Sequence, residues 1–61
     1  MCFVVIVDDE PAIGEEFLEA FNILGCTARY FERGSEGLTF LQETELHVHL
    51  VLIDLMMPEL S

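Results

Sequence analysis

The chain has 61 residues, of which 52% are hydrophobic, and its formal net charge is -10. A chain of about this size buries only roughly 60% of its unfolded surface, so it usually needs a disulfide, a metal or a partner for stability. The high apolar fraction excludes intrinsic disorder. Twelve acidic residues against two basic ones argue against binding to nucleic acid or to an acidic membrane surface.

No segment has the pattern of a membrane span or of a secretory signal. The early apolar run, residues 1–7, ends at Asp8 and lacks a basic leader. Two cysteines, Cys2 and Cys26, are too few for a secreted disulfide scaffold. We therefore expect a cytoplasmic protein in which both thiols are reduced, free and buried.

The first two predicted elements are a strand and a helix. Residues 2–7 form a continuous apolar run rich in valine, which is typical of a strand buried on both faces. Residues 11–24 have glutamates on one side and predict an amphipathic helix, with Pro11 in its first turn and Gly25 as its stop. Gly14 inside this helix costs about 1 kcal/mol relative to alanine. The expected apolar face consists of Ile13, Phe17, Ala20, Phe21 and Leu24.

A second strand and a shorter helix follow. Residues 26–31 predict a strand that is more exposed than the first, because Thr27 and Arg29 are polar. Residues 36–44 predict a helix with Ser35 as its N-cap. The side chains that we expect to point inward from this helix are Leu38, Phe40 and Leu41.

The last predicted element is a third strand, residues 50–54, which is almost wholly apolar and is followed by a loop over residues 56–61. The order is therefore β-α-β-α-β, without a linker or a repeat. Alternation of this kind predicts an α/β fold with a parallel sheet and right-handed helical crossovers.

Aspartates follow two of these strands. Asp8 and Asp9 come after the first strand, and Asp54 ends the third. Parallel strands end at the same edge of a sheet, where α/β proteins bind ligands, so the three carboxylates converge if the strands are neighbours. At about 4 Å and an effective dielectric constant near 20, each pair repels by on the order of 4 kcal/mol, so either one carboxyl is protonated or a cation lies among them.

The type of cation follows from the ligands. Oxygen ligands without histidine or cysteine favour magnesium, manganese or calcium over zinc, and magnesium suits one or two carboxylates with water and phosphate. A simpler interpretation of Asp8 or Asp9 alone is capping of the first helix. A nucleotide hydrolase is excluded because the chain has no glycine-rich phosphate loop with lysine. An Asp-x-Asp phosphatase is disfavoured because Leu55 and Met56 follow Asp54.

Three stretches resemble the receiver domain of two-component response regulators: VVIVDDEP at 4–11, GSEGL at 34–38 and LVLIDLMMPEL at 50–60. The resemblance is specific because it combines an acidic pair after the first strand, an aspartate at the end of the third, and Pro58 four residues later. It implies that Asp54 is the phospho-acceptor, which takes a phosphoryl group from the phosphohistidine of a sensor histidine kinase. Such a domain is not a conventional enzyme, although the parent domain would catalyse its own aspartyl phosphorylation.

The resemblance also implies a set of metal ligands. Asp9 corresponds to the direct magnesium ligand, Asp8 to a partner that acts mostly through water, and Asp54 and the backbone carbonyl of Met56 complete the protein ligands. The expected ion is Mg²⁺, with Mn²⁺ as a possible replacement. Glu10 is not carried over as a ligand, and we expect it to cap the helix or to face solvent.

The resemblance covers only the first half of a receiver domain. It implies half of a flavodoxin-like, doubly wound sheet with strand order 2-1-3. In the family two further strands and three helices follow, and they carry the Ser or Thr and the Lys of the switch. This chain has no lysine, and its late hydroxyls are those of Thr39, Thr44 and Ser61. We therefore expect residues 1–61 to be a truncated receiver domain without that switch.

Two further expectations concern surfaces. The helices should cover opposite faces of the sheet and leave the third strand as an exposed apolar edge. The alternative function is thus a non-catalytic fragment that keeps the acidic pocket and self-associates, most simply as a two-fold dimer through Leu50–Ile53. His47 and His49 are either a metal pair or an exposed turn, and the turn is favoured.

Overall fold

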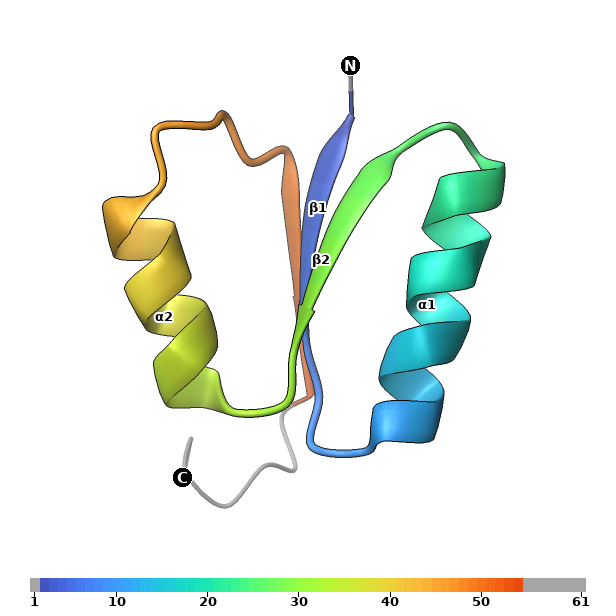
Figure 1. Cartoon of the computed structure of the whole chain (residues 1–61), viewed down its shortest axis with the longest axis horizontal. Helices are drawn as coiled ribbons and strands as arrows, with labels where there is room; N and C mark the ends of the chain where they lie inside the picture. The colour runs from blue at the N-terminus through green and yellow to red at the C-terminus, as the bar shows by residue number, and fades with distance from the viewer. Residues whose placement is uncertain (1, 55–61) are drawn as a thin grey trace.

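The computed structural model describes residues 2–54 of the chain. The five elements are β1 (Phe3–Val7), α1 (Pro11–Ile23), β2 (Thr27–Phe31), α2 (Gly34–Glu43) and β3 (Leu50–Ile53). The three strands are parallel and lie in the order β2-β1-β3 (Figure 1). The predicted α/β fold class, element order and strand order are therefore confirmed. Neither helix of the described region is long and apolar enough to cross a membrane.

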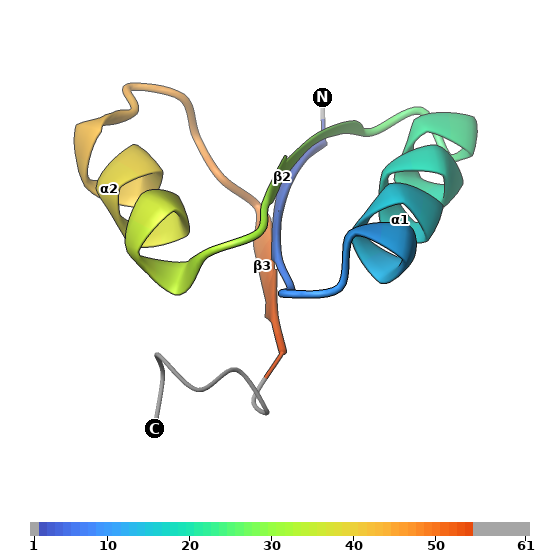
Figure 2. The same ribbon diagram turned by 60° about the horizontal axis from the view of Figure 1, so that its bottom comes forward.

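β1 lies at the centre of the sheet and is buried on both faces. Its most exposed residue, Phe3, keeps only 6% of its surface accessible, and Val4 and Val5 keep none. Both helices contact β1 and β2, and they lie on opposite sides of the sheet (Figure 2). The continuous apolar run therefore forms a strand that is enclosed from above, from below and on both edges.

α1 begins where the sequence predicts and ends at Ile23, two residues before a glycine. Pro11 occupies the first turn, where its missing N–H has no helical partner to lose. Gly25 has a φ of 85°, a left-handed conformation that glycine adopts without strain. The predicted apolar face is partly wrong: Phe17 and Leu24 are 40% and 74% exposed, and Ala20 is exposed as well. The residues that face the sheet most closely are Ile13, Gly14, Leu18 and Phe21, because α1 lies over β1 and β2 and leaves β3 uncovered.

α2 differs from the prediction at its start and in one inward side chain. The helix begins at Gly34 with Arg33 in the N-cap position, so Ser35 lies inside the first turn and is not the cap. Leu38 is 57% exposed, which corrects the inward orientation expected for it. Phe40 and Leu41 do pack against the cluster formed by the buried valines of β1.

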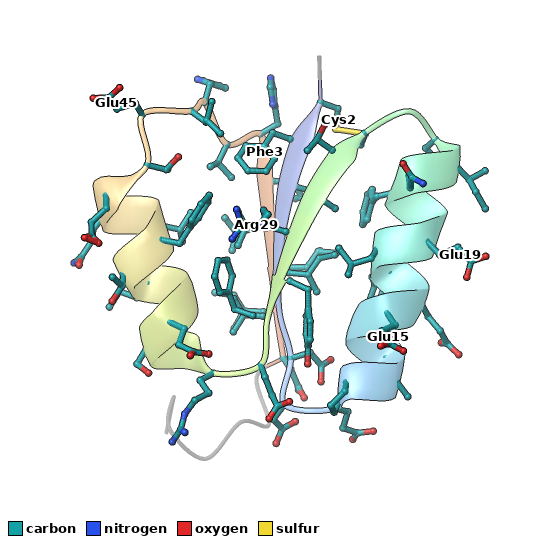
Figure 3. All side chains as sticks on the ribbon, in the orientation of Figure 1. Cys2, Phe3, Glu15, Glu19, Arg29 and Glu45 are labelled. Atoms are coloured by element: carbon teal, nitrogen blue, oxygen red, sulfur yellow. A yellow bond between two sulfur atoms is a disulfide. The ribbon has the colours of Figure 1, made fainter. Side chains whose placement is uncertain are left out.

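An arginine covers the aromatic residues between α2 and the sheet. The Phe40 ring lies 5.2 Å from the Phe31 ring and 6.0 Å from the Phe3 ring, measured between centroids. The guanidinium carbon of Arg29 lies 5.0 Å from the Phe40 centroid and 5.6 Å from the Phe31 centroid (Figure 3). Cation–π attraction of this kind is worth about 0.5–1 kcal/mol at an exposed site. Arg29, one of the two polar residues from which we predicted a more exposed strand, thus also stabilises the apolar layer between α2 and the sheet.

β3 is an exposed edge, as predicted. Its neighbour in the sheet is β1, and Leu50 and Ile53 remain 43% and 47% exposed. Neither helix reaches over β3 in the described region. Within residues 2–54, β3 is therefore an apolar strand with one unpaired edge and no helix in contact with it.

The two cysteines form a disulfide, which corrects the expectation of free thiols. Cys2 and Cys26 immediately precede β1 and β2, and their Cα atoms are 4.6 Å apart (Figure 3). Neighbouring parallel strands that start at the same end of a sheet bring such residues within disulfide range. A backbone hydrogen bond of 2.8 Å from Thr27 N–H to the Cys2 carbonyl holds the two strand ends together beside the bond.

Candidate metal centre

The three predicted aspartates meet at one edge of the sheet. One carboxylate oxygen from each of Asp8, Asp9 and Asp54 lies within 4.8 Å of the others. The strand register explains this convergence, because Val7 of β1 pairs with Ile53 of β3 and the aspartates follow directly. The Asp54 N–H continues the ladder with a 2.9 Å hydrogen bond to the Val7 carbonyl. The predicted grouping of these residues is therefore present in the structure.

Asp8 is held by three hydrogen bonds. Its N–H donates to the Phe31 carbonyl at 3.1 Å, and its own carbonyl accepts a 2.6 Å hydrogen bond from the Tyr30 hydroxyl. Its Oδ1 accepts a 2.9 Å hydrogen bond from the Glu10 N–H, which closes the turn into α1. Asp8 is only 8% exposed, so these bonds also compensate the burial of a polar residue.

The three carboxylates differ in their access to solvent. Asp8 is buried, Asp54 is half-buried and Asp9 is exposed. The site is therefore open to solvent on the side of Asp9 and closed on the side of Asp8, so a hydrated ion or a phosphate has access to it. A hollow of about 270 Å³ adjoins it, and seven residues line it: Ile6, Val7, Asp8, Phe17, Leu52, Ile53 and Asp54.

The donor set fits a hard divalent cation. All the side-chain ligands offered are carboxylate oxygens, which magnesium prefers. Oxygens on opposite sides of one magnesium ion are about 4.2 Å apart, so oxygens within 4.8 Å suit an ion that one residue holds through water. A cation there would also remove the mutual repulsion of the carboxylates.

Tyr30 is a member of the site that the sequence did not reveal. Burial raises the pKa of its hydroxyl above the ordinary value of 10.0, and the nearby carboxylates of Glu32, Asp8, Asp9 and Glu15 raise it further. The hydroxyl therefore stays protonated and can donate to the Asp8 carbonyl. In the sequence Tyr30 only favours a strand; nothing in the pattern of residues 26–31 marks the partner of its hydroxyl.

The other predicted site residues have different outcomes. Asp8 supports the turn before α1 through Glu10 N–H, but the N-cap position itself belongs to Glu10, whose side chain makes no capping hydrogen bond. Glu10 is exposed, which is one of the two situations expected for it. The carbonyl of Met56, predicted as a further ligand, lies outside the described residues.

The two histidines lie before β3, at the other end of the sheet from the aspartates. The rings of His47 and His49 are 4.7 Å apart between centroids, and both residues are exposed. Nδ1 of His49 accepts a 3.1 Å hydrogen bond from the Phe3 N–H, and the His49 N–H donates to the Phe3 carbonyl at 2.9 Å. A neutral ring that accepts at Nδ1 carries its proton on Nε2, which leaves no lone pair there for a metal. The exposed-turn interpretation is thus favoured, with His49 extending the sheet edge.

Comparison with known proteins agrees with this geometry. The family model of the response regulator receiver domain matches residues 4–61. The chain belongs to the receiver domain family. Membership supports a phospho-acceptor role in a two-component response regulator, and receiver domains typically bind Mg²⁺ in an acidic pocket such as the one formed here. No curated protein and no solved structure gives a significant match to the chain.

Proposed function

We propose that this receiver chain accepts a phosphoryl group on Asp54 from the phosphohistidine of a sensor histidine kinase, in the cytoplasm. The observation that supports this most is the convergence of Asp54 with Asp8 and Asp9 in a chain of the receiver family. The net charge of -10 also supports a domain that binds a protein partner rather than nucleic acid or an acidic membrane.

In the proposed step, a carboxylate oxygen of Asp54 attacks phosphorus while the phosphorus–nitrogen bond of phosphohistidine breaks. The product is an aspartyl phosphate and a neutral histidine, after the ring takes up a proton. Asp54 suits this role because it is half-buried, held by its own N–H, and adjacent to an open hollow through which a donor can approach. In-line positioning of this kind is the main requirement of phosphoryl transfer.

The proposed metal ligands are Asp8, Asp9 and Asp54, with the backbone carbonyl of Met56 as a fourth protein ligand. When bound, Mg²⁺ or Mn²⁺ supplies positive charge that neutralises phosphoryl oxygens. Asp8 would act from a fixed position, because its backbone and one carboxylate oxygen are hydrogen-bonded. Asp9, which is exposed, would meet the hydrated ion from the solvent side.

Incubation with acetyl phosphate and Mg²⁺ tests the proposal. We expect intact-mass analysis to show one added phosphoryl group, lost in Asp54→Asn and retained in Glu19→Gln. Glu19 lies on α1 and points away from the sheet, so its variant removes one charge without touching the site (Figure 3). No uptake by the wild-type chain, or equal uptake by Asp54→Asn, would contradict the proposal.

The second candidate function is a non-catalytic fragment that associates with a second copy through β3. The exposed apolar edge favours it, since Leu50 and Ile53 are nearly half exposed on a strand that has one unpaired side among residues 2–54. Light scattering at micromolar concentration should then give a dimer that Ile53→Lys dissociates. Ile23→Lys is the matched control, because Ile23 is 77% exposed on α1, away from this edge. A stable monomer would defeat this candidate.

A further inference from the structure

The strand β2, which contributes no aspartate, binds the backbone of Asp8, the first residue of the aspartate pair. Its residues Tyr30 and Phe31 both bind the peptide groups of Asp8. The Asp8 N–H donates to the Phe31 carbonyl at 3.1 Å, and the Tyr30 hydroxyl donates to the Asp8 carbonyl at 2.6 Å. The first bond continues the sheet, whereas the second is a side-chain contact that reaches beyond the end of β1. The Asp8 carbonyl is thus fixed at the point where the chain leaves the sheet.

The position of the Tyr30 ring explains why its hydroxyl reaches that carbonyl. Tyr30 pairs with Ile6 in the strand register, so its side chain lies on the α1 face of the sheet. There the ring packs against Gly14, and a Cβ atom at that position would overlap it. The ring is therefore held between strand and helix, with its hydroxyl directed at the turn that connects them.

The Asp8 carbonyl belongs to the peptide that leads into Asp9. Fixing this group restricts the backbone of the Asp8–Asp9 peptide, and the Glu10 N–H to Asp8 Oδ1 bond restricts the Asp8 side chain. The tyrosine hydroxyl thus binds the peptide group that joins two of the three aspartates of the cluster. Ligands that are fixed by outer hydrogen bonds bind a metal more tightly than ligands that must be ordered on binding.

From this geometry we infer that Tyr30 is a positioning residue of the cation site, which orders Asp8 and Asp9 through its hydroxyl. The inference rests on the proposed function, because it concerns the same carboxylate cluster. Tyr30 contacts no ion itself. Its contribution lies in the conformation of the turn between β1 and α1, so its removal should change cation affinity more than it changes folding.

Titration calorimetry with MgCl₂ alone tests this on the full chain. Tyr30→Phe keeps the ring against Gly14 and removes only the hydroxyl. We expect its dissociation constant for Mg²⁺ to rise roughly fivefold, the size of one lost hydrogen bond. The control is Phe40→Leu, a destabilising change on the opposite face of the sheet, which should leave the Mg²⁺ constant within about twofold of wild type. Circular dichroism at the titration temperature establishes that each variant is folded.

Three results would overturn the inference. An unchanged Mg²⁺ constant in Tyr30→Phe would make the hydroxyl a purely structural group. Equal weakening in Tyr30→Phe and Phe40→Leu would assign the effect to general stability. A wild-type chain that binds no Mg²⁺ would remove the proposed metal site itself, and a flat wild-type isotherm distinguishes that outcome from the other two.

Discussion

The ring of Tyr30 occupies the space that a side chain at Gly14 would need. This contact lets α1 approach the sheet closely beside the aspartates, and it requires glycine for its lack of a Cβ atom. Alanine would gain about 1 kcal/mol of helix propensity at this position. It would also push against an aromatic ring held between helix and strand, and overpacking of this kind costs about 1–3 kcal/mol.

We therefore predict that Gly14→Ala lowers the free energy of unfolding by up to about 2 kcal/mol, the overpacking cost less the propensity gain. Displacing the ring would also weaken Mg²⁺ binding, because the Tyr30 hydroxyl would lose its place at Asp8. Urea unfolding and calorimetry measure the two effects. Ala12→Gly, an exposed change in the same helix, is the control for propensity alone. A more stable Gly14→Ala variant would show that the ring moves without cost.

The titration of Tyr30 gives a second prediction. Its pKa is raised in the folded state, so it contributes stability that is fully present below the unfolded value of 10.0 and is lost as pH rises through the higher folded value. The chain has one tyrosine and no lysine, and the disulfide cysteines do not titrate, so few other groups change charge in this range.

Urea unfolding in alkaline buffers without divalent cations should therefore show a loss of stability above pH 10.0 in the wild-type chain. The loss should be absent or much reduced in Tyr30→Phe. Tyrosinate absorbance in the folded and unfolded chain reports the two pKa values directly. An equal alkaline loss in both proteins would assign the effect to another group.

Much of the fold and of the aspartate site could be predicted from the sequence, and each feature that could not has a specific cause. The buried run of β1 and the aspartates after β1 and β3 follow a strong local pattern, and the topology of parallel strands brings them together. The first turn of α2 is less determined, because Gly34 and Ser35 both suit a helix start. Leu38 is exposed because the helix has only two strands beneath it. The roles of Tyr30 and of the cysteine pair depend on contacts between elements, which no local pattern encodes.

The disulfide gives a third prediction. It closes a loop between residues 24 positions apart, and loop-closure entropy of that length corresponds to about 3.5 kcal/mol. Reduction by dithiothreitol should lower the free energy of unfolding by about this amount. The double variant Cys2→Ser, Cys26→Ser should match the reduced wild type and should not respond to reductant. Equal urea midpoints for oxidised and reduced chains would contradict the prediction.

The mutual repulsion of the carboxylates gives a fourth prediction. In buffer with a chelator, Asp9→Asn should raise the free energy of unfolding by up to about 1 kcal/mol, since two unit charges at about 4 Å in a watery setting repel by that amount. Glu19→Gln removes the same charge on the side of α1 that faces away from the sheet and should have a smaller effect (Figure 3). With excess Mg²⁺ the order should reverse, because Asp9→Asn loses a ligand. A gain in Glu19→Gln equal to that in Asp9→Asn would reflect net charge alone.

The aspartates follow two strands, β1 and β3, that should differ in their resistance to local unfolding. β1 is enclosed on every side, so its amides should exchange hydrogen only through global unfolding, whereas β3 has one strand neighbour in the described region and can detach by a local opening. Such an opening would carry Asp54 away from Asp8 and Asp9 while the rest of the chain stays folded. An ion bound by aspartates of both strands would then oppose the local opening of β3. Slower amide exchange in β3 on adding Mg²⁺ would be the evidence for this effect.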